Sequence, residues 1–83
     1  MVMMTGTVIV RLKEGVLDPQ GQTIRRALEH MGFQGIENIR AGKTFEIHLD
    51  APNAEAAKTR LTEMSQKLLA NPVIETFHVE VKS

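Results

Sequence analysis

The segment of residues 12–32 limits the possible folds more than any other stretch of this chain. Asp18-Pro19 is a strong helix start, because a short acceptor side chain precedes a proline where no backbone donor is needed. An apolar stripe then recurs at helical spacing, formed by Ile24, Ala27, Leu28 and Met31. Gly32 stands where a left-handed residue commonly ends a helix. The segment therefore predicts a helix with one apolar face, preceded by a strand and a loop.

The loop before this helix carries two apolar residues, Val16 and Leu17, inside a connection that is otherwise polar. Such a pair either covers the end of the hydrophobic core or is kept exposed for contact with a partner. The sequence alone leaves both interpretations open.

Four stretches of the chain have the character of strands. Residues 5–12, 44–49 and 74–81 alternate between apolar and polar side chains, which is typical of half-buried strands. Residues 36–41 match this pattern less well, and Gly42 would supply the positive φ of a tight hairpin leading into the next strand. Two strands joined by so short a turn must pair antiparallel.

A second helix is predicted between the third and fourth of these strands. Asn53 is a suitable N-cap for it. Its apolar stripe consists of Ala57, Leu61, Met64 and Leu68. The helix must end near Ala70, because Asn71 precedes Pro72 and is steered away from helical angles.

The element order β-α-β-β-α-β predicts a single α+β domain over residues 1–83. Right-handed crossovers favour a ferredoxin-like fold, with a four-stranded antiparallel sheet and both helices on one face. The other face would be solvated or laid against another subunit. It would carry Thr7, Ile9, Arg11, Arg40, Glu46, His48, Thr76, His78 and Glu80.

Composition excludes several classes of protein. The absence of cysteine rules out a disulfide framework and a cysteine-based zinc site. Ten basic and ten acidic residues give a formal net charge of zero, which argues against nucleic acid or an anionic membrane as the main partner. We expect no signal peptide and no membrane span, and hence a cytoplasmic protein. A domain this small is expected to associate with itself or with a larger partner.

A search for an active site finds no catalytic, cofactor-binding or metal-binding residues. The sequence lacks a cysteine nucleophile, a glycine-rich phosphate loop and a serine-centred elbow. His48 and His78 would share the uncovered face with Glu46 and Glu80. The two histidines would lie two strand spacings apart, roughly 10 Å, which is too far for ligands of one ion. RNA binding on such a sheet would need exposed aromatic side chains and a basic surface, which this sequence does not offer. Acylphosphatase-like chemistry would need an anion-binding loop after the first strand, but that loop is acidic in this chain.

Two stretches remain as candidates for docking to a partner, because each combines exposed apolar residues with a rigid turn. They are the loop before the first helix and the turn before the last strand. Their candidate residues are Val16, Leu17, Asp18, Pro19, Asn71, Pro72 and Glu75. Both stretches could equally be caps over the ends of the core.

Three stretches of the chain closely resemble the PurS family. They are LKEGVLDPQGQTI, RRALEHMGFQGIENIRAGKTFEIHL and LLANPVIETFHVEV, and the resemblance runs from about Val8 to Val81, nearly the whole chain. Within the second stretch, the matching hairpin motif adds Arg40, Gly42 and Lys43 to the docking candidates.

The resemblance implies the small subunit of phosphoribosylformylglycinamidine (FGAM) synthase, the fourth step of purine synthesis, in organisms that build the enzyme from three chains. It implies a homodimer without an active site that joins the glutaminase subunit, PurQ, to the synthetase subunit, PurL. ATP and Mg²⁺ would bind the synthetase, and ammonia would pass between the partners. The alternatives are a stand-alone ferredoxin-like ligand-binding module, as ACT domains are, and a small enzyme using His48 or His78.

Overall fold

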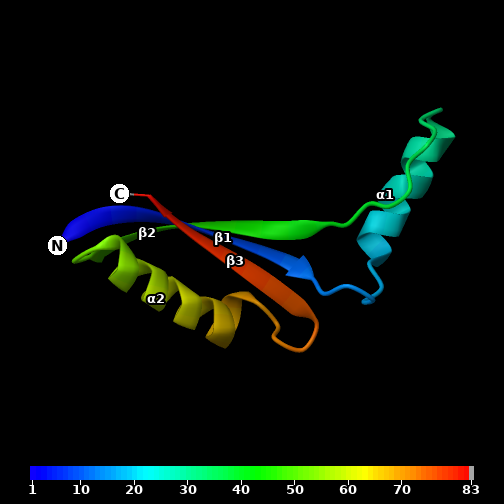
Figure 1. Cartoon of the computed structure of the whole chain (residues 1–83). Helices are drawn as coiled ribbons and strands as arrows, with labels where there is room; N and C mark the ends of the chain where they lie inside the picture. Colours follow the sequence, from blue (N-terminus) through cyan, green and yellow to red (C-terminus); the bar gives the residue numbers. More distant parts are fainter. Residues whose placement is uncertain (83) are drawn as a thin grey trace.

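Three antiparallel strands form the sheet in the computed structural model, which describes residues 1–82 (Figure 1). The strands are β1 (Val2–Leu12), β2 (Gly42–Ala51) and β3 (Glu75–Lys82), in the spatial order β2-β1-β3. Val8 of β1 lies opposite Phe45 of β2 and Val79 of β3, so the apolar residues of all three strands share one face. This arrangement confirms the α+β class and the alternation of apolar and polar side chains predicted for these three strands. The expected domain end at Ser83 lies outside the described residues.

The helix α2 (Ala54–Met64) covers this apolar face (Figure 1). Asn53 caps it as predicted, since its side-chain oxygen accepts a hydrogen bond of 2.8 Å from the backbone N–H of Ala56. Leu61 of the helix is fully buried together with Val8 and Val10 of the sheet. Complete burial of such an aliphatic side chain stabilises a fold by about 1.5–3 kcal/mol. The core therefore lies between α2 and the sheet.

A π-helical turn, η1 (Ser65–Leu69), continues α2 and corrects one predicted core residue. The backbone N–H of Ala70 donates to the carbonyl oxygen of Ser65 at 2.9 Å, which closes a wider turn than an α-helix allows. This turn contains one residue more than an α-helical turn, so the side chains that follow point in different directions from those of a continuous α-helix. Leu68, predicted to lie in the apolar stripe, is 84% exposed, whereas Leu69 packs against the core.

The helix α1 (Pro19–His30) has the predicted start and end but not the predicted position. Its first residue is Pro19, and Gly32 just beyond its end has a φ of +98°. Figure 1 shows that α1 projects from one end of the sheet instead of covering a face. Only Gly21 of this helix is buried. The prediction that two helices cover one face is therefore wrong, because α2 covers it alone.

The predicted fourth strand does not form, so the four-stranded ferredoxin-like arrangement is wrong. Residues 36–41 instead run back along α1 (Figure 1), and the guanidinium of Arg25 donates to the carbonyl oxygen of Ile36 at 3.0 Å. Ile36 and Ile39 are three residues apart, a spacing that gives an extended segment no single apolar face. Arg40 consequently lies outside the sheet and is not part of its uncovered face.

Gly42 does not adopt the predicted positive φ of a hairpin; it is the first residue of β2. Position 42 requires glycine for a steric reason instead, because a Cβ atom there would lie 2.6 Å from the carbonyl oxygen of Val10. Within residues 1–82, no helix is long and apolar enough to cross a membrane.

Candidate docking site

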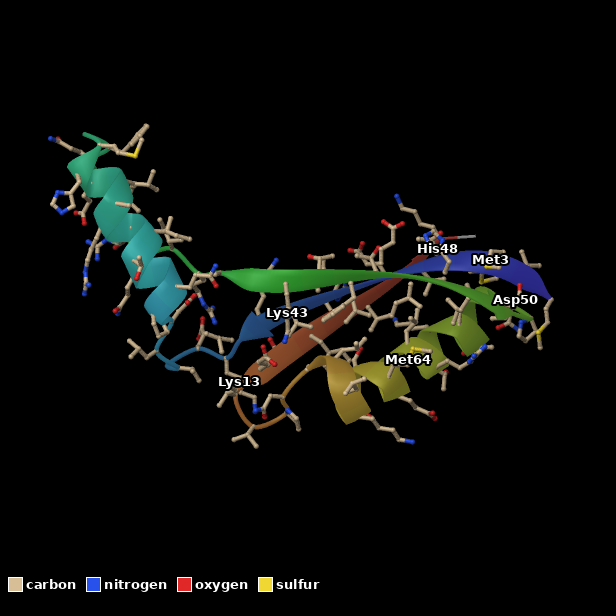
Figure 2. All side chains as sticks on the ribbon, turned by 180° about the vertical axis from the view of Figure 1, so that it is seen from behind. Met3, Lys13, Lys43, His48, Asp50 and Met64 are labelled. Carbon is tan, nitrogen blue, oxygen red and sulfur yellow. The ribbon has the colours of Figure 1, made fainter. Side chains whose placement is uncertain are left out.

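The predicted docking residues come from three separate stretches of sequence, and the structure gathers them at one end of the sheet. We call this end the junction: here β1 ends, β2 and β3 begin, and α1 departs (Figure 1). Figure 2 shows Lys13 and Lys43 at the junction, whereas Met3 and Asp50 lie at the opposite end of the strands. The structure thus places the loop before α1, the start of β2 and the turn before β3 in one region.

Asp18 joins the start of α1 to the segment that returns from it. Its carboxylate accepts a hydrogen bond of 2.9 Å from the backbone N–H of Gly21 and one of 2.7 Å from that of Ala41. The two backbone donors, first that of Gly21 and then that of Ala41, lower the pKa of Asp18, with a smaller contribution from the charge of Arg40. Asp18 is therefore both the predicted helix cap and a link between residues 23 positions apart.

The small size of Gly21 brings the returning segment against the first turn of α1. A Cβ atom at this position would collide with the carbonyl oxygen of Ile39. Arg40, the next residue along, donates from its guanidinium to the carbonyl oxygen of Leu12 at the end of β1. The base of α1 is therefore fixed to the sheet by short polar contacts on both of its connections.

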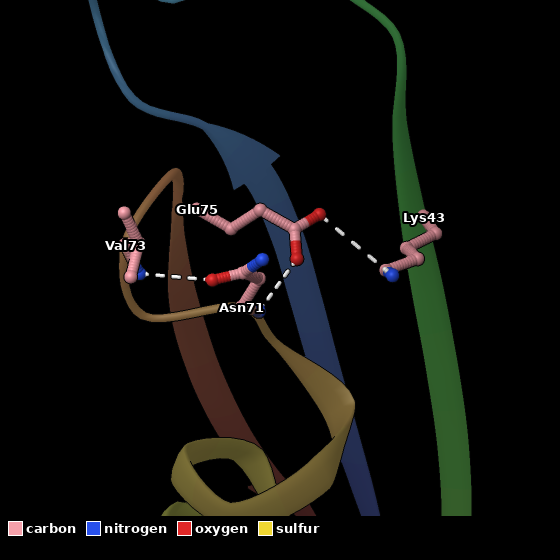
Figure 3. A network of polar contacts seen from close by, with 4 residues as sticks. All are labelled: Lys43, Asn71, Val73 and Glu75. Carbon is pink, nitrogen blue, oxygen red and sulfur yellow. Dashed lines mark hydrogen bonds and ion pairs between the residues drawn. The ribbon is translucent and has the colours of Figure 1, made fainter.

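A second polar network holds the turn before β3 (Figure 3). One carboxylate oxygen of Glu75 accepts a hydrogen bond of 2.6 Å from the backbone N–H of Asn71, and the other lies 3.7 Å from Nζ of Lys43. The side chain of Asn71 in turn accepts a hydrogen bond of 3.0 Å from the backbone N–H of Val73. The backbone N–H of Lys13 donates to the carbonyl oxygen of Ile74 at 2.8 Å, which ties this turn to the end of β1.

The junction presents apolar side chains and an open groove beside these networks. Leu17 is 66% exposed and Val73 is 77% exposed, whereas Val16 is half-buried. The groove has a volume of about 560 Å³ and lies between the loop before α1 and residues 38–40. Pro19 and Pro72 are exposed and stiffen the two turns. A rigid frame with exposed apolar residues suits the docking of another protein.

The sequence did not reveal every residue that builds the junction. The docking candidates do not include Leu12, Lys13, Ala41 and Ile74, because these residues join the networks through backbone groups, which side-chain patterns do not mark. The apolar alternation had indicated only that β1 ends near Leu12. No sequence pattern indicates the exposure of Met31 and Phe33 on and after α1, which are 72% and 54% exposed, because an apolar stripe usually predicts burial.

Comparison with known proteins adds to this geometry. A family model for PurS, described as phosphoribosylformylglycinamidine (FGAM) synthase, matches residues 5–83. The chain belongs to the PurS family. It is 42% identical to the FGAM synthase subunit PurS of Methanocaldococcus jannaschii over 80 residues, which cover 96% of each chain. It is 40% identical to the PurS subunit of Bacillus subtilis over 75 residues, which cover 90% of this chain and 88% of the relative.

Solved PurS structures have the same fold. The PurS of M. jannaschii, described as one of the subunits of formylglycinamide ribonucleotide amidotransferase in the purine biosynthetic pathway, matches with a TM-score of 0.87 at 41% identity over 96% of each chain. A chain of the structure of PurLQS from Thermotoga maritima matches with a TM-score of 0.89 at 29% identity, covering 99% of this chain and 100% of that one. The three-stranded sheet and projecting α1 are therefore features of a PurS fold.

The histidines of this PurS-family chain lie apart on the uncovered face of the sheet. His48 is opposite Thr5 of β1, and its ring nitrogens lie 3.2 Å from Oγ1 of Thr5 and 3.0 Å from Oε1 of Glu46. His78 is opposite Ile9, so the two histidines differ by four residues along β1 in addition to two strand spacings, or roughly 16 Å. Within residues 1–82, no group of three or more potential metal ligands converges.

Proposed function

We propose that this chain is the non-catalytic small subunit of FGAM synthase and that it holds the glutaminase subunit, PurQ, against the synthetase subunit, PurL. Glutamine would supply ammonia at one partner, and ATP and Mg²⁺ would be used at the other. The observation that carries the proposal is the match over nearly the whole chain to PurS, including a chain of the PurLQS structure. Such a role requires exposed, rigid surfaces and no catalytic group of its own.

We assign the docking role to the junction. Its candidate residues are Val16, Leu17, Asp18, Pro19, Arg40, Gly42, Lys43, Asn71, Pro72 and Glu75. The polar networks of Asp18 and Glu75 hold two turns in place, and Leu17 is exposed between them and α1. A side chain that is already held in place loses little conformational entropy when a partner binds, which favours affinity.

The proposal also includes a homodimer in the cytoplasm, where a purine-synthesis enzyme would work. Self-association is supported by the surfaces that this chain leaves uncovered: one face of the sheet and the apolar stripe of α1. Ile24 and Met31 of that stripe are 39% and 72% exposed. A helix of twelve residues gains most of its stability from packing, so a second surface against α1 would stabilise it.

The bridging role can be tested by comparing turnover with free ammonia to turnover with ammonia released from glutamine. Without this subunit, PurL given free ammonia should still form product, because its substrate sites lie on its own chain. Turnover driven by glutamine should collapse, because production and use of ammonia are no longer held in one particle. An equal loss of both activities on omission would contradict bridging and point to a direct part in catalysis.

A matched pair of surface variants locates the docking. Leu17→Ser at the junction should weaken glutamine-driven turnover of the reconstituted complex about tenfold at limiting subunit concentration, since loss of one apolar anchor costs about 1–2 kcal/mol. Val2→Ser is the control, because Val2 is 52% exposed at the opposite end of β1. Ammonia-driven turnover should be unchanged in both. Equal effects of the two variants would refute docking at the junction.

A second test addresses the absence of catalysis by this chain. The double variant His48→Gln and His78→Gln should retain glutamine-driven activity, because among residues 1–82 each histidine has polar contacts only with a nearby Glu on its own strand and, for His48, with Thr5. Activity of the reconstituted complex is measured alongside assembly by light scattering. A hundredfold loss, equivalent to about 2.7 kcal/mol, with assembly intact would overturn the non-catalytic role.

A further inference from the structure

The π-helical turn η1 determines which of two neighbouring leucines is exposed. A continuous α-helix would place Leu68 seven residues after the buried Leu61, on the same face, and would turn Leu69 away from the core. In the structure Leu69 packs against the core and Leu68 is 84% exposed. One leucine is buried in either case. Burial of a leucine therefore does not explain the turn, and the placement of the exposed leucine is its distinctive result.

Hydrogen bonds at both ends hold η1 in this form. Ser65 is fully buried, and its hydroxyl donates to the carbonyl oxygen of Leu61 at 2.8 Å. A serine that bonds back to the preceding turn in this way often bends a helix. At the other end, the buried Ala70 donates its backbone N–H to the carbonyl oxygen of Ser65 at 2.9 Å. Single π-helical turns are frequent at functional sites, so the exposed Leu68 is a candidate contact residue.

Leu68 is one of several exposed apolar residues at the end of α2. We call this group the η1 knob; its members are Leu68, Pro72, Val73 and Ile74. Val73 is 77% exposed and Ile74 is 39% exposed. The side chain of Asn71 accepts a hydrogen bond from the backbone N–H of Val73, which fixes the turn that carries these residues (Figure 3). Exposed apolar residues on a rigid frame are suited to contact with another protein.

A groove of about 360 Å³ lies beside the η1 knob. Gln66 of η1 and Pro72 of the following turn both line it, so the groove connects the two parts of the knob. The half-buried Phe77 of β3 also lines it, together with Lys13 at the end of β1. An apolar side chain of a partner would enter this groove while the knob contacts the surface around that side chain.

The free charges around the knob are positive. Lys67 of η1 directly precedes its exposed leucine, and the backbone N–H of Lys13 donates to the carbonyl oxygen of Ile74 at 2.8 Å. Among residues 1–82 neither lysine forms an ion pair. The nearby side chain of Glu75 is only 15% exposed, and Glu14 lines the groove beside α1 instead. Carboxylates around an apolar pocket on the partner would therefore complement the knob.

We propose that the η1 knob docks one of the two partner subunits, through an apolar pocket bordered by carboxylates, and that Leu17 and the loop before α1 dock the other. The inference rests on the proposed bridging function and divides its docking surface in two. A subunit that holds two different proteins together needs two surfaces that are free at the same time. Leu17 lies on the connection to α1, whereas the knob lies at the end of α2 (Figure 1).

Two titrations assign each surface to a partner. With the full chain limiting, glutamine-driven turnover is measured while PurL is varied at saturating PurQ, and then while PurQ is varied at saturating PurL. Leu68→Ser should raise the half-maximal concentration of one partner about tenfold, and Leu17→Ser that of the other. The control Val2→Ser should change neither. Ammonia-driven turnover should be unchanged in all three variants.

A charge reversal tests the chemistry of the partner surface independently. Lys67→Glu should raise the same half-maximal concentration as Leu68→Ser by severalfold, because it sets a negative charge against the carboxylates of the pocket. Lys58→Glu is the matched control, since Lys58 is exposed on α2, and it should have no effect. Added salt should weaken assembly with the wild-type chain more than with Lys67→Glu, because salt screens the attraction. Far-UV dichroism checks that each variant is folded.

The outcomes separate the two surfaces from the bridging function. An effect of Leu68→Ser on the partner that Leu17→Ser affects, or on both partners, would overturn the division. No effect of Leu68→Ser would overturn docking at the knob, and equal effects of Lys67→Glu and Lys58→Glu would overturn the acidic partner surface. Altered sedimentation of the Leu68→Ser chain alone would assign the knob to self-association instead. Bridging itself fails only if omission of the chain lowers glutamine-driven and ammonia-driven turnover equally.

Discussion

The two α-helices of this chain have similar lengths and similar apolar stripes, yet only one of them belongs to the core. Ala57 and Leu61 of α2 are fully buried against the sheet. In α1, Ile24 and Met31 from the predicted stripe are 39% and 72% exposed. Both helices begin at side-chain caps, Asp18 and Asn53, with hydrogen bonds of 2.9 and 2.8 Å. The local signals for a helix are thus equally good, and the difference lies in what covers the apolar face.

This difference shows that an amphipathic pattern predicts that one face of a helix packs against another surface. The pattern does not identify that surface. For α2 the cover is the sheet of the same chain. For α1, the connections through Asp18 and Arg40 fix its base at the end of the sheet, where it extends beyond the strands (Figure 1). A subunit that works inside an assembly can leave such a helix for its partners.

The largest expected difference between the two helices is in their contribution to global stability. Leu61→Ala should lower the free energy of unfolding by about 2–5 kcal/mol, because it opens a cavity between α2 and the sheet. Met31→Ala should change it by less than about 0.5 kcal/mol in dilute protein. Urea unfolding followed by far-UV dichroism, at one fixed chain concentration, measures both. Similar costs for the two variants would show that α1 is part of the same cooperative unit as α2.

Local chemistry explains which parts of the fold the sequence could predict. The starts of α1 and α2 follow from Asp18-Pro19 and Asn53, and the faces of the strands follow from alternation. These features depend on residues close together in the chain. The π-helical turn at Ser65 and the consequent exposure of Leu68 depend instead on how α2 fits the sheet, which no local pattern records.

The same distinction applies to the candidate site. The sequence predicts Asp18 as a cap, but the second hydrogen bond that it accepts, from the backbone N–H of Ala41, joins segments that only the folded chain brings together. Gly42 is predicted from the sequence to supply the positive φ of a hairpin turn, whereas the folded chain requires glycine there because β1 passes too close for a side chain. Whether the ten docking candidates contact PurL or PurQ depends on the partner surfaces, so their role stays a prediction.

A smaller effect should distinguish the two helix caps. Asn53→Ala should lower the free energy of global unfolding by about 1 kcal/mol, because α2 must form for the core to be covered. Asp18→Ala should cost less global stability and act locally, by releasing the base of α1 from Ala41. Amide hydrogen exchange should then accelerate at Gly21 and Ala41 but not at Val8 in the sheet. Faster exchange at Val8 would contradict this separation.

The smallest expected effect is a pH dependence confined to α1. The backbone donors of Gly21 and Ala41 favour the charged carboxylate and so hold the pKa of Asp18 below its ordinary value of 3.8. Because the folded pKa is lower than the unfolded one, the stabilisation is complete well above pH 3.8 and is lost as the pH falls below that value through the folded pKa. The amide resonance of Ala41 should therefore shift in that acidic range.

Two controls decide whether this titration belongs to Asp18. In Asp18→Asn the amide resonance of Ala41 should no longer follow pH there, because the side chain cannot ionise. The amide of Ala56, which is capped by the neutral Asn53, should stay constant in both proteins. If the resonances of Ala41 and Ala56 moved together, the acid transition would be global. The base of α1 is held by the ionisable carboxylate of Asp18, whereas α2 is held by the neutral amide of Asn53 and by its packing on the core. Lowering the pH should therefore affect α1 before it affects α2.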